Sequence, residues 1–507
     1  MAPQLESERK YLLSRDQQLP SLGEVASEGE ASEFVMVATY YDAVDFRLIR
    51  SWQVLRRRTG GTDEGWHLKL PGQDADHRVE VHAPLDGPRV PAELRAQVSA
   101  TLKSAALFPV ATLRTLRHQV PLLDASGAVQ ALVCIDRVSA TVDGRTTTWR
   151  EAEVELADGP ATLLDAVEER FRAAGINRAP VGSKVARALE AAITAAADRV
   201  VTPQDSGGDV VRDYLAIQVG VLQSREQAVR ADEPDAVHRS RVATRRLRSA
   251  LRTFSGIFDR SVTDPLRAEL RWHAEELGAP RDAEVLKERL LASLEAIPQE
   301  LVAPEVRDRI ASSLDAAHLK AHAELVATMG SPRYEQLQVD LERLLADPPV
   351  SPAADQPAVE VLPLMLDAAV ARVRRLARHA EAKPADLTRW HEVRKAAKAA
   401  RYCSEALASA FGEPAKSLVT AWEQVTEAFG EVQDTVVAQQ VIGDLAWEAE
   451  QAGLPRTAFD ELAHDQEQLR REALHRGVEA LKAAVQRAMS TNLAEVTDAR
   501  SSGDSST

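Results

Sequence analysis

Residues 151–156 read Glu-Ala-Glu-Val-Glu-Leu, and this hexapeptide decides how the first part of the chain folds. Successive side chains of a β-strand point to opposite faces, so the three glutamates share one face and the three apolar residues share the other. The apolar face would pack on a hydrophobic core. Three neighbouring carboxylates repel one another, and bound cations would relieve that repulsion. The hexapeptide therefore predicts a strand whose charged face holds cations.

Most of residues 1–157 shows the same alternation, in short runs separated by Gly, Pro and Asp. This pattern is typical of antiparallel β-structure. Helical segments are expected near 91–105 and 160–172 and from 182 onward. Several predicted strands carry charged side chains along one face, and some of these faces are acidic while others are basic. The charged positions are Glu6, Glu8, Lys10, Arg56, Arg58, Lys69, Glu80 and Asp136.

Two interpretations of the charged strand faces are open. The plain one is a sheet whose polar face meets solvent. The alternative is a closed barrel with a polar interior, in which carboxylates bind divalent cations and arginine or lysine binds phosphates. Phosphoryl transfer uses both groups, because metal ions neutralise developing charge and cationic side chains position the phosphates. The sequence shows no Ser/His/Asp arrangement, cysteine nucleophile or GxxxxGK[ST] loop that competes with this chemistry.

The second part of the chain is helical and duplicated. Apolar residues recur at 3.6-residue spacing from about 209 to 490, with a break at 346–358. The pattern HxxRxxxRxxR beginning at His238 recurs as HxxRxxxKxxR beginning at His391, 153 residues later. The pattern LGxxRD beginning at Leu277 recurs as FGxxQD beginning at Phe429, 152 residues later. Two motifs that recur after nearly the same number of residues indicate a duplicated helical unit.

A basic stripe follows one face of the first repeated helix. Residues 238–252 read HRSRVATRRLRSALR, with six arginines and no acid. Positions 238, 241, 245, 248 and 252 are three or four residues apart, so they share a face, and like charges at this spacing cost roughly 0.2–0.5 kcal/mol per pair. A solvated basic face is the plain interpretation. Because the stripe recurs on a second helix of an acidic protein, a bound polyanion is favoured.

The composition excludes several classes of protein. The 507 residues carry 62 basic and 77 acidic side chains, a net charge of −15, which argues against general coating of nucleic acid. The start MAPQLESERK does not resemble a signal peptide, and no apolar run approaches the roughly 20 residues that span a bilayer. Cys134 and Cys403 belong to no CxxC or Cys/His cluster, so neither disulfides nor structural zinc are expected. We therefore expect a cytoplasmic protein without a membrane partner.

The motifs of the first part resemble the CYTH domain of the triphosphate tunnel metalloenzymes. The resemblance covers about 1–197 and follows the order ExExK, YYDAVDFRL, LRRRTGGTDEGWHLKLPG, IDRV, WREAEVEL and GSKVARAL. It implies an eight-stranded antiparallel tunnel that binds triphosphate compounds and hydrolyses them with Mg²⁺ or Mn²⁺.

This resemblance also implies roles for individual residues. The implied metal ligands are Glu6, Glu8, Asp136, Glu153 and Glu155, with Glu80 and Glu151 as further candidates. The implied triphosphate-binding residues are Lys10, Arg56, Arg58, Lys69, Arg117 and Lys184. The candidate catalytic residues are Glu153, Glu155 and Lys10, with a glutamate of the 151–155 strand as the base.

The helical motifs HxxRVxxRRLRSxLR, LGxxRD, HExRKxxKxxRY and FGxxQD resemble the CHAD domain over about 209–490. The resemblance implies two related bundles whose basic faces meet around a groove for inorganic polyphosphate. Nucleic acid is disfavoured, because the stripes lack interleaved aromatic residues for base stacking. Asp282 and Asp434 are either salt-bridge partners or helix caps. The implied polyphosphate-binding residues are His238, Arg241, Arg245, Arg248, Arg252, His391, Arg394, Lys395, Lys398 and Arg401.

The chain is thus predicted to be an α+β multidomain protein. An eight-stranded antiparallel β-barrel with flanking helices at 1–197 and a linker at 198–208 precede an all-α domain of two repeated bundles. These bundles are expected at 209–345 and 359–490, before a disordered tail at 491–507. The predicted function is metal-dependent hydrolysis of inorganic triphosphate or a related short triphosphate compound, coupled to polyphosphate binding and association with polyphosphate granules. The alternatives are a non-catalytic polyphosphate-binding protein and a tunnel enzyme for an organic triphosphate, of thiamine triphosphatase or adenylate cyclase type.

Overall fold

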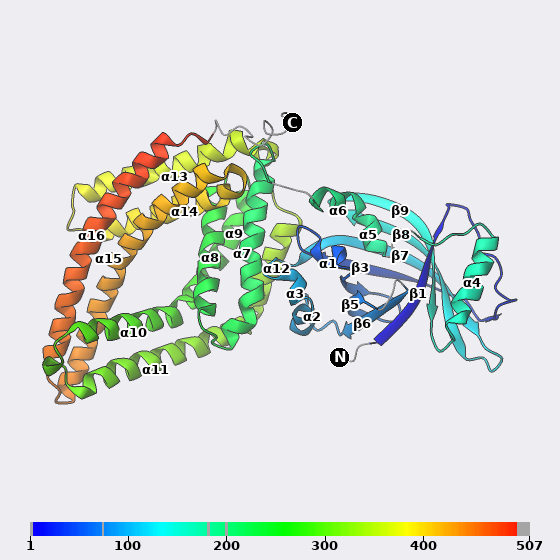
Figure 1. The fold of residues 1–507 in the computed structure, drawn as a ribbon, viewed down its shortest axis with the longest axis horizontal. Coiled ribbons are helices and arrows are strands. Elements are labelled where there is room, and N and C mark those ends of the chain that lie inside the picture. The colour runs from blue at the N-terminus through cyan, green and yellow to red at the C-terminus, as the bar shows by residue number, and fades with distance from the viewer. Residues whose placement is uncertain (1–3, 73–75, 180–182, 198–200, 494–507) are drawn as a thin grey trace, which may run out of the picture. The chain divides into compact units, whose positions relative to one another are not determined.

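The computed structural model describes residues 4–72, 76–179, 183–197 and 201–493. The chain forms two compact units: the barrel unit, Met1–Arg199 with Leu341–Asp347, and the helical unit, Val200–Asp340 with Pro348–Thr507. An antiparallel barrel followed by a helical region confirms the predicted fold class (Figure 1). Residues 198–200 of the predicted linker and 494–507 of the predicted tail lie outside the described residues. No described helix is both long and apolar enough to cross a membrane.

Eight antiparallel strands close the barrel unit. Their order around the barrel is β7-β3-β4-β5-β6-β1-β9-β8, and pairing of β8 with β7 completes the ring, while the short β2 adds to β7. The strands are β1 Gln4–Leu13, β2 Ser27–Glu28, β3 Ser32–Asp42, β4 Val54–Thr59, β5 Gly65–Pro71, β6 His77–Ala83, β7 Phe108–Leu123, β8 Val129–Val142 and β9 Arg145–Leu156. Closure leaves the eight strands without an unpaired edge and gives the barrel an inside and an outside.

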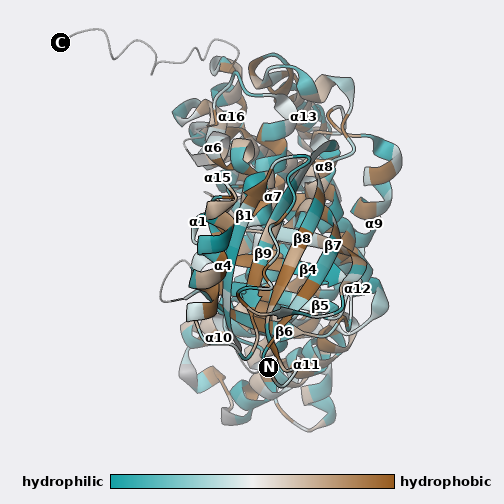
Figure 2. Ribbon diagram, turned by 90° about the vertical axis from the view of Figure 1, so that its right-hand side faces the viewer, coloured by the Kyte–Doolittle hydropathy of each residue, from teal (hydrophilic) through white to brown (hydrophobic). Residues whose placement is uncertain are grey.

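Helices cover apolar patches on the outside of the barrel. Ala152 and Val154 of β9 are fully buried in a cluster with Phe171 of α4. The covering helices are α1 Arg47–Arg50, α2 Ala92–Gln97, α3 Ser99–Leu102, α4 Thr162–Ala173, α5 Lys184–Ala188 and α6 Glu190–Ala197. Polar and apolar residues alternate along the strands (Figure 2), so Glu153 points inward, where it is 3% exposed. The interpretation of this strand face as a solvated surface is therefore wrong.

The helical unit carries the two repeated sequence motifs on helices of its two halves. Its described helices are α7 Gly207–Arg230, α8 Ala236–Thr253, α9 Arg260–Glu276, α10 Gly278–Ala296, α11 Pro304–Met329, α12 Pro332–Ala346, α13 Ala358–Glu381, α14 Leu387–Phe411, α15 Glu413–Gln451 and α16 Thr457–Ser490, and the end of α12 from residue 341 onward is assigned to the barrel unit. The repeated histidine and arginine pattern lies on α8 and α14. The repeated glycine begins α10 in the first half, whereas Gly430 lies inside the continuous helix α15 in the second.

A shared core joins the two halves of the helical unit. Leu290 of α10 and Ile310 of α11 are fully buried in one cluster with Ile442 of α15 and Leu462 of α16. The long helices α15 and α16 run side by side in Figure 1, and α10 and α11 meet their far ends. Helix α7 begins at Gly207, so the end of the predicted linker is helical.

Candidate functional site

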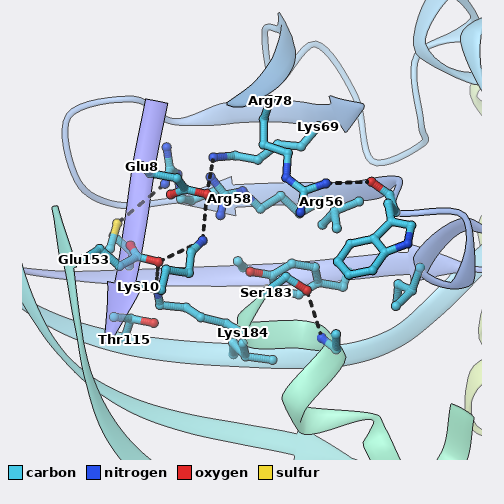
Figure 3. A pocket seen from close by; sticks show the side chains of 18 of the residues that line it. Glu8, Lys10, Arg56, Arg58, Lys69, Arg78, Thr115, Glu153, Ser183 and Lys184 are labelled. Carbon is cyan, nitrogen blue, oxygen red and sulfur yellow. Dashed lines mark hydrogen bonds and ion pairs between the residues drawn. The ribbon is translucent and has the colours of Figure 1, made fainter. Parts of the chain in front are cut away.

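A cavity of about 400 Å³ lies inside the barrel (Figure 3). Nine of the residues singled out from the sequence line it: Glu8, Lys10, Arg56, Arg58, Lys69, Arg117, Glu153, Glu155 and Lys184. Arg78 also lines the cavity and was not among the predicted phosphate-binding residues. The alternation of strand faces thus brings acids and cations from distant parts of the chain to one interior space.

Strand register brings three of the acids together. Glu8 on β1 lies opposite Glu155 on β9, and Lys10 lies opposite Glu153. One ligand oxygen from each of Glu8, Glu153 and Glu155 lies within 4.8 Å of the other two. Carboxylate oxygens are the ligands that Mg²⁺ and Mn²⁺ prefer, so these three residues fit the predicted metal.

Lys10 bridges the acids of the two strands. Its Nζ lies 2.8 Å from Oε1 of Glu8 and 3.1 Å from Oε1 of Glu153 (Figure 3). Burial alone would raise the pKa of Glu8, but Lys10 and Lys69 outweigh burial and hold that pKa at about 2. The carboxylate of Glu8 is therefore ionised at neutral pH and available to a cation.

A second acid group lies deeper in the barrel. Asp136, Glu151 and Glu153 each offer an oxygen within 4.8 Å of the others. Lys184 of α5 contacts all three acids. Its Nζ lies 3.0 Å from Asp136, 2.9 Å from Glu151 and 2.5 Å from Glu153. Arg117 adds hydrogen bonds of 2.9 and 2.7 Å to Asp136. Asp136 was assigned to the metal side, and the structure places it between two cations.

The other acids singled out from the sequence lie on β1 and β6. Glu6 contacts Lys69, and burial together with a hydrogen bond to Glu80 raises the pKa of Glu6 to about 8. Glu80 also lies 3.8 Å from Arg56 and 2.9 Å from Nδ1 of His67. His67 was not predicted, although it shares a strand face with Lys69. Burial lowers the pKa of His67 to about 4, so its ring is neutral at neutral pH.

A second candidate site lies where α8 packs against α14 in the helical unit. We call the residues Arg241, Arg245, Arg394 and Lys398 the basic cluster. Burial and then the three arginines lower the pKa of Lys398 to about 6, while Asp434 of α15 acts in the opposite direction. In the described part of the chain, no partner accepts a hydrogen bond from the buried Nε atoms of the three arginines. Each arginine of the basic cluster therefore has a buried N–H group that no described residue satisfies.

The repeated glycines make room for two of these arginines. A Cβ added to Gly278 would lie 3.6 Å from Nη2 of Arg241, and one added to Gly430 would lie 3.1 Å from Nη2 of Arg394. Asp282 is a salt-bridge partner, with Oδ1 2.7 Å from Nη1 of Arg241. The two motifs of each repeat therefore meet in space and form one half of the site.

Known proteins match both units of the chain. Residues 4–189 match the model of the CYTH domain, and residues 213–443 match the model of the CHAD domain. The uncharacterized protein Rv2226 of Mycobacterium tuberculosis is 34% identical over 518 residues, which cover 96% of this chain and 98% of that protein. The chain belongs to the CYTH–CHAD family.

Two solved structures are also similar to this CYTH–CHAD protein. PptA from Streptomyces chartreusis is 23% identical with a TM-score of 0.43, and the match covers 56% of this chain and 99% of PptA. The CHAD domain from the plant Ricinus communis is 23% identical with a TM-score of 0.44, and the match covers 57% of this chain and 94% of that domain.

The CHAD domain does not bring all the predicted residues into the basic cluster. Arg401 is paired elsewhere, with its guanidinium 3.1 Å from Glu405 and 2.5 Å from Glu423. Lys395 is exposed and pairs with Glu392 one turn earlier on its own helix. These two cations have carboxylate partners, so they are weaker candidates for binding an anion than Arg245, Arg394 and Lys398 of the basic cluster.

The remaining residues of the CHAD stripes flank the basic cluster. Burial lowers the pKa of His238, and the nearby Arg281 and Arg245 lower it further. Gln433 forms a hydrogen bond with His391. Arg281 was seen as part of the repeated motif but not as a binding residue, although it occupies the position equivalent to Gln433. The other stripe residues, Arg248 and Arg252, continue along α8.

Proposed function

We propose that the CYTH domain hydrolyses inorganic triphosphate or a related short triphosphate compound with Mg²⁺ or Mn²⁺, and that the CHAD domain binds polyphosphate. The observation that carries the proposal is a single cavity that holds both the acids Glu8, Glu153 and Glu155 and a set of buried cations. When bound, a divalent ion supplies positive charge that offsets the charge of the phosphates. Lysine and arginine side chains then position the phosphate chain for attack on its terminal phosphorus.

The position of each side chain in the cavity indicates its proposed role in hydrolysis. Lys10 lies between Glu8 and Glu153, so its ammonium would bind a phosphate oxygen beside the carboxylates. Arg56 and Arg58 would hold phosphates through paired N–H groups. The side chain of Glu155 is 35% exposed, whereas that of Glu153 is 3% exposed. Glu155 therefore has better access to water and is the stronger candidate for the base, with Glu153 as a buried ligand.

The basic cluster supports polyphosphate as the ligand of the CHAD domain. Its cations repel one another, and a flexible chain of phosphates would relieve that repulsion without any base recognition. Tyr402 lies beside Arg394 but is only 5% exposed, so it offers no open face for a nucleobase. Both cysteines are unpaired and buried, which agrees with the proposed cytoplasmic location.

Phosphate release from the full chain tests the proposed hydrolysis. Tripolyphosphate, ATP, thiamine triphosphate and long-chain polyphosphate are each assayed with Mg²⁺, with Mn²⁺ and in excess EDTA. We expect metal-dependent release from a short triphosphate and none in EDTA. Undiminished release in EDTA, or no release from any of the four compounds with metal, would contradict the proposal.

A further inference from the structure

The end of α15 carries an exposed tryptophan between two acids, beyond residue 443, where the match to the CHAD model ends. Trp447 is 63% exposed, although tryptophan is usually largely buried. Asp444 lies one turn before it and Glu448 directly after it, and both acids are exposed. Neither acid pairs with a cation among the described residues. We call Asp444, Trp447 and Glu448 the acidic tryptophan patch.

The sequence around this patch is acidic throughout. Residues 417–455 contain seven acids and no lysine, arginine or histidine. A run of one sign along a helix gives its exposed side a field that attracts a surface of the opposite sign. The patch therefore suits a partner surface that is apolar at its centre and basic at its edge.

A groove of about 590 Å³ lined by α13 and α16 has an apolar floor. Leu481, Val485 and Met489 of α16 are four residues apart, so they share one face of the helix. Met489 is 65% exposed at the end of this row. Burying an apolar group on these side chains would be favourable.

The rim of the groove is basic. Arg374 and Arg378 are exposed one turn apart on α13, and neither has a salt-bridge partner among the described residues. Lys482 lies on the α16 side, with its Nζ 2.9 Å from Oε1 of Glu479. Glu381 is the one acid among the described residues that line the groove. A ligand that is charged throughout would leave the apolar floor unused, so the groove fits an apolar group flanked by negative charge.

The patch and the groove of one copy lie too far apart to meet. Leu445 of α15 and Phe459 of α16 share one buried cluster, so Trp447 lies beside the start of α16. Met489 follows Phe459 by 30 residues on the same helix, a distance of about 45 Å at roughly 1.5 Å per residue. The two helices run side by side in Figure 1, so the patch and the groove lie at opposite ends of the pair.

We propose that the acidic tryptophan patch of one copy docks in the groove of a second copy of this chain. The indole ring would be buried on the apolar floor, and the two acids of the patch would face the two arginines of the rim. Tryptophan is enriched among the residues that dominate binding energy, and complementary charges fix the orientation of a contact. Because the contact joins two different surfaces, it closes into a two-fold pair when each copy engages the other and otherwise extends to further copies. The assignment does not depend on the ligand of either domain.

Sedimentation velocity of the full chain over a range of concentrations tests the contact. We expect self-association that weakens with salt, because the charges of the rim are exposed. Trp447→Ala should weaken it by at least about thirtyfold. Trp52→Ala is the matched control, because Trp52 is 60% exposed but lines the cavity of the CYTH domain. A parent that stays monomeric, or a Trp447→Ala variant that associates like the parent, would overturn the assignment.

Mixing two defective variants separates docking from a loss of fold. Trp447→Ala keeps the groove, whereas Arg374→Glu combined with Arg378→Glu keeps the patch. Each variant alone should stay monomeric where the parent associates, but the mixture should form one-to-one pairs, since the groove of the first can take the patch of the second. Circular dichroism checks that both are folded. A mixture without such pairs contradicts the docking. Weaker polyphosphate binding by the arginine variant with unchanged self-association would assign the groove to polyphosphate instead.

Discussion

The CYTH and CHAD domains both gather arginines and lysines, but they compensate the charge differently. In the CYTH domain each predicted phosphate-binding cation has a carboxylate within salt-bridge distance, as Lys184 has in Asp136, Glu151 and Glu153. In the described part of the CHAD domain, Arg245 and Lys398 form no such pair. The cations of the CYTH cavity are already paired with carboxylates, so a phosphate ligand or a metal ion would have to replace one partner of an existing ion pair. Among the described residues of the basic cluster, Arg241 pairs with Asp282, but Arg245 and Lys398 have no salt-bridge partner, so a polyanion would mostly add to the cluster.

The two arrangements have opposite consequences for folding. Removing one partner of a buried ion pair leaves an uncompensated charge and is strongly destabilising. Removing an unpaired buried cation relieves desolvation and repulsion instead. The CYTH cations should therefore stabilise their fold, whereas the CHAD cluster should be retained for binding at a cost in stability.

The largest expected effect comes from replacing Glu153, which forms salt bridges with three cations of the cavity. Glu153→Gln keeps the shape of the side chain but removes a charge next to Lys10, Arg117 and Lys184. Because Glu153 is proposed as a buried metal ligand, turnover of the preferred triphosphate should fall by about two to three orders of magnitude. Steady-state phosphate release checks this, with circular dichroism to show that the variant is folded. Glu33→Gln, on an exposed position of β3, is the matched control and should behave like the parent. Parent-like turnover by Glu153→Gln would contradict the role of this acid.

The next effect concerns the basic cluster as a whole. Replacing Arg241, Arg245, Arg394 and Lys398 together by alanine should weaken binding of long-chain polyphosphate by more than about a hundredfold. The parent affinity should also fall steeply with salt, because phosphate contacts release counterions. Calorimetry at several salt concentrations measures both. Lys395→Ala is the control, because this lysine is exposed and paired with Glu392. A quadruple variant that binds like the parent would place the groove elsewhere.

Two lysine-to-methionine changes should shift stability in opposite directions. Lys184→Met removes the partner of three buried carboxylates and should lower the free energy of unfolding by about 3 kcal/mol. Lys398→Met removes a buried amine whose protonated form is disfavoured by burial and by three arginines, and should raise the free energy of unfolding by about 1 kcal/mol. Urea unfolding of the full chain measures both changes, and Lys103→Met at an exposed position is the control. The contrast between the domains is lost if both changes have the same sign.

The smallest effect is a dependence on pH. Lys398 has a folded pKa of about 6 against an ordinary value of 10.5, with burial first and Arg245, Arg394 and Arg241 next among the causes. Between these values the unfolded chain binds a proton that the folded chain lacks, so this residue makes stability rise with pH across that window. A bound polyanion favours the charged lysine, so affinity should rise by up to about tenfold as pH falls toward 6. In Lys398→Arg the side chain stays charged, so the rise in polyphosphate affinity toward pH 6 should disappear. Binding measured at several pH values checks this.

Much of the CYTH site followed from the alternation of strand faces. The spacing of Glu151, Glu153 and Glu155 placed them on one face, and barrel closure turned that face inward. The alternation of strand faces does not show which side chains of other elements a charged strand face contacts. The position of Lys184 among three acids depends on how α5 packs, and the exposure of Trp52 depends on a left-handed turn that is unusual for tryptophan.

In the CHAD domain, helical spacing identified the stripes but not which members stay unpaired. Arg401 fits the stripe as well as Arg394 does, yet Glu405 and Glu423 lie within reach of it. Glu423 comes from a different helix, so only the packing of α14 against α15 brings this acid to Arg401.

The glycine inside α15 limits how this protein can be made more resistant to heat. Replacing a helical glycine by alanine commonly stabilises a protein by about 0.4–1 kcal/mol, since it restricts the unfolded chain. At Gly443 of α15 an added Cβ meets nothing within 4 Å, so thermostability engineering can use that position. At Gly430 the same change would place a methyl group 3.1 Å from Arg394. Sequence-based design that treats the two glycines alike would gain stability at Gly443 and displace Arg394 of the basic cluster at Gly430.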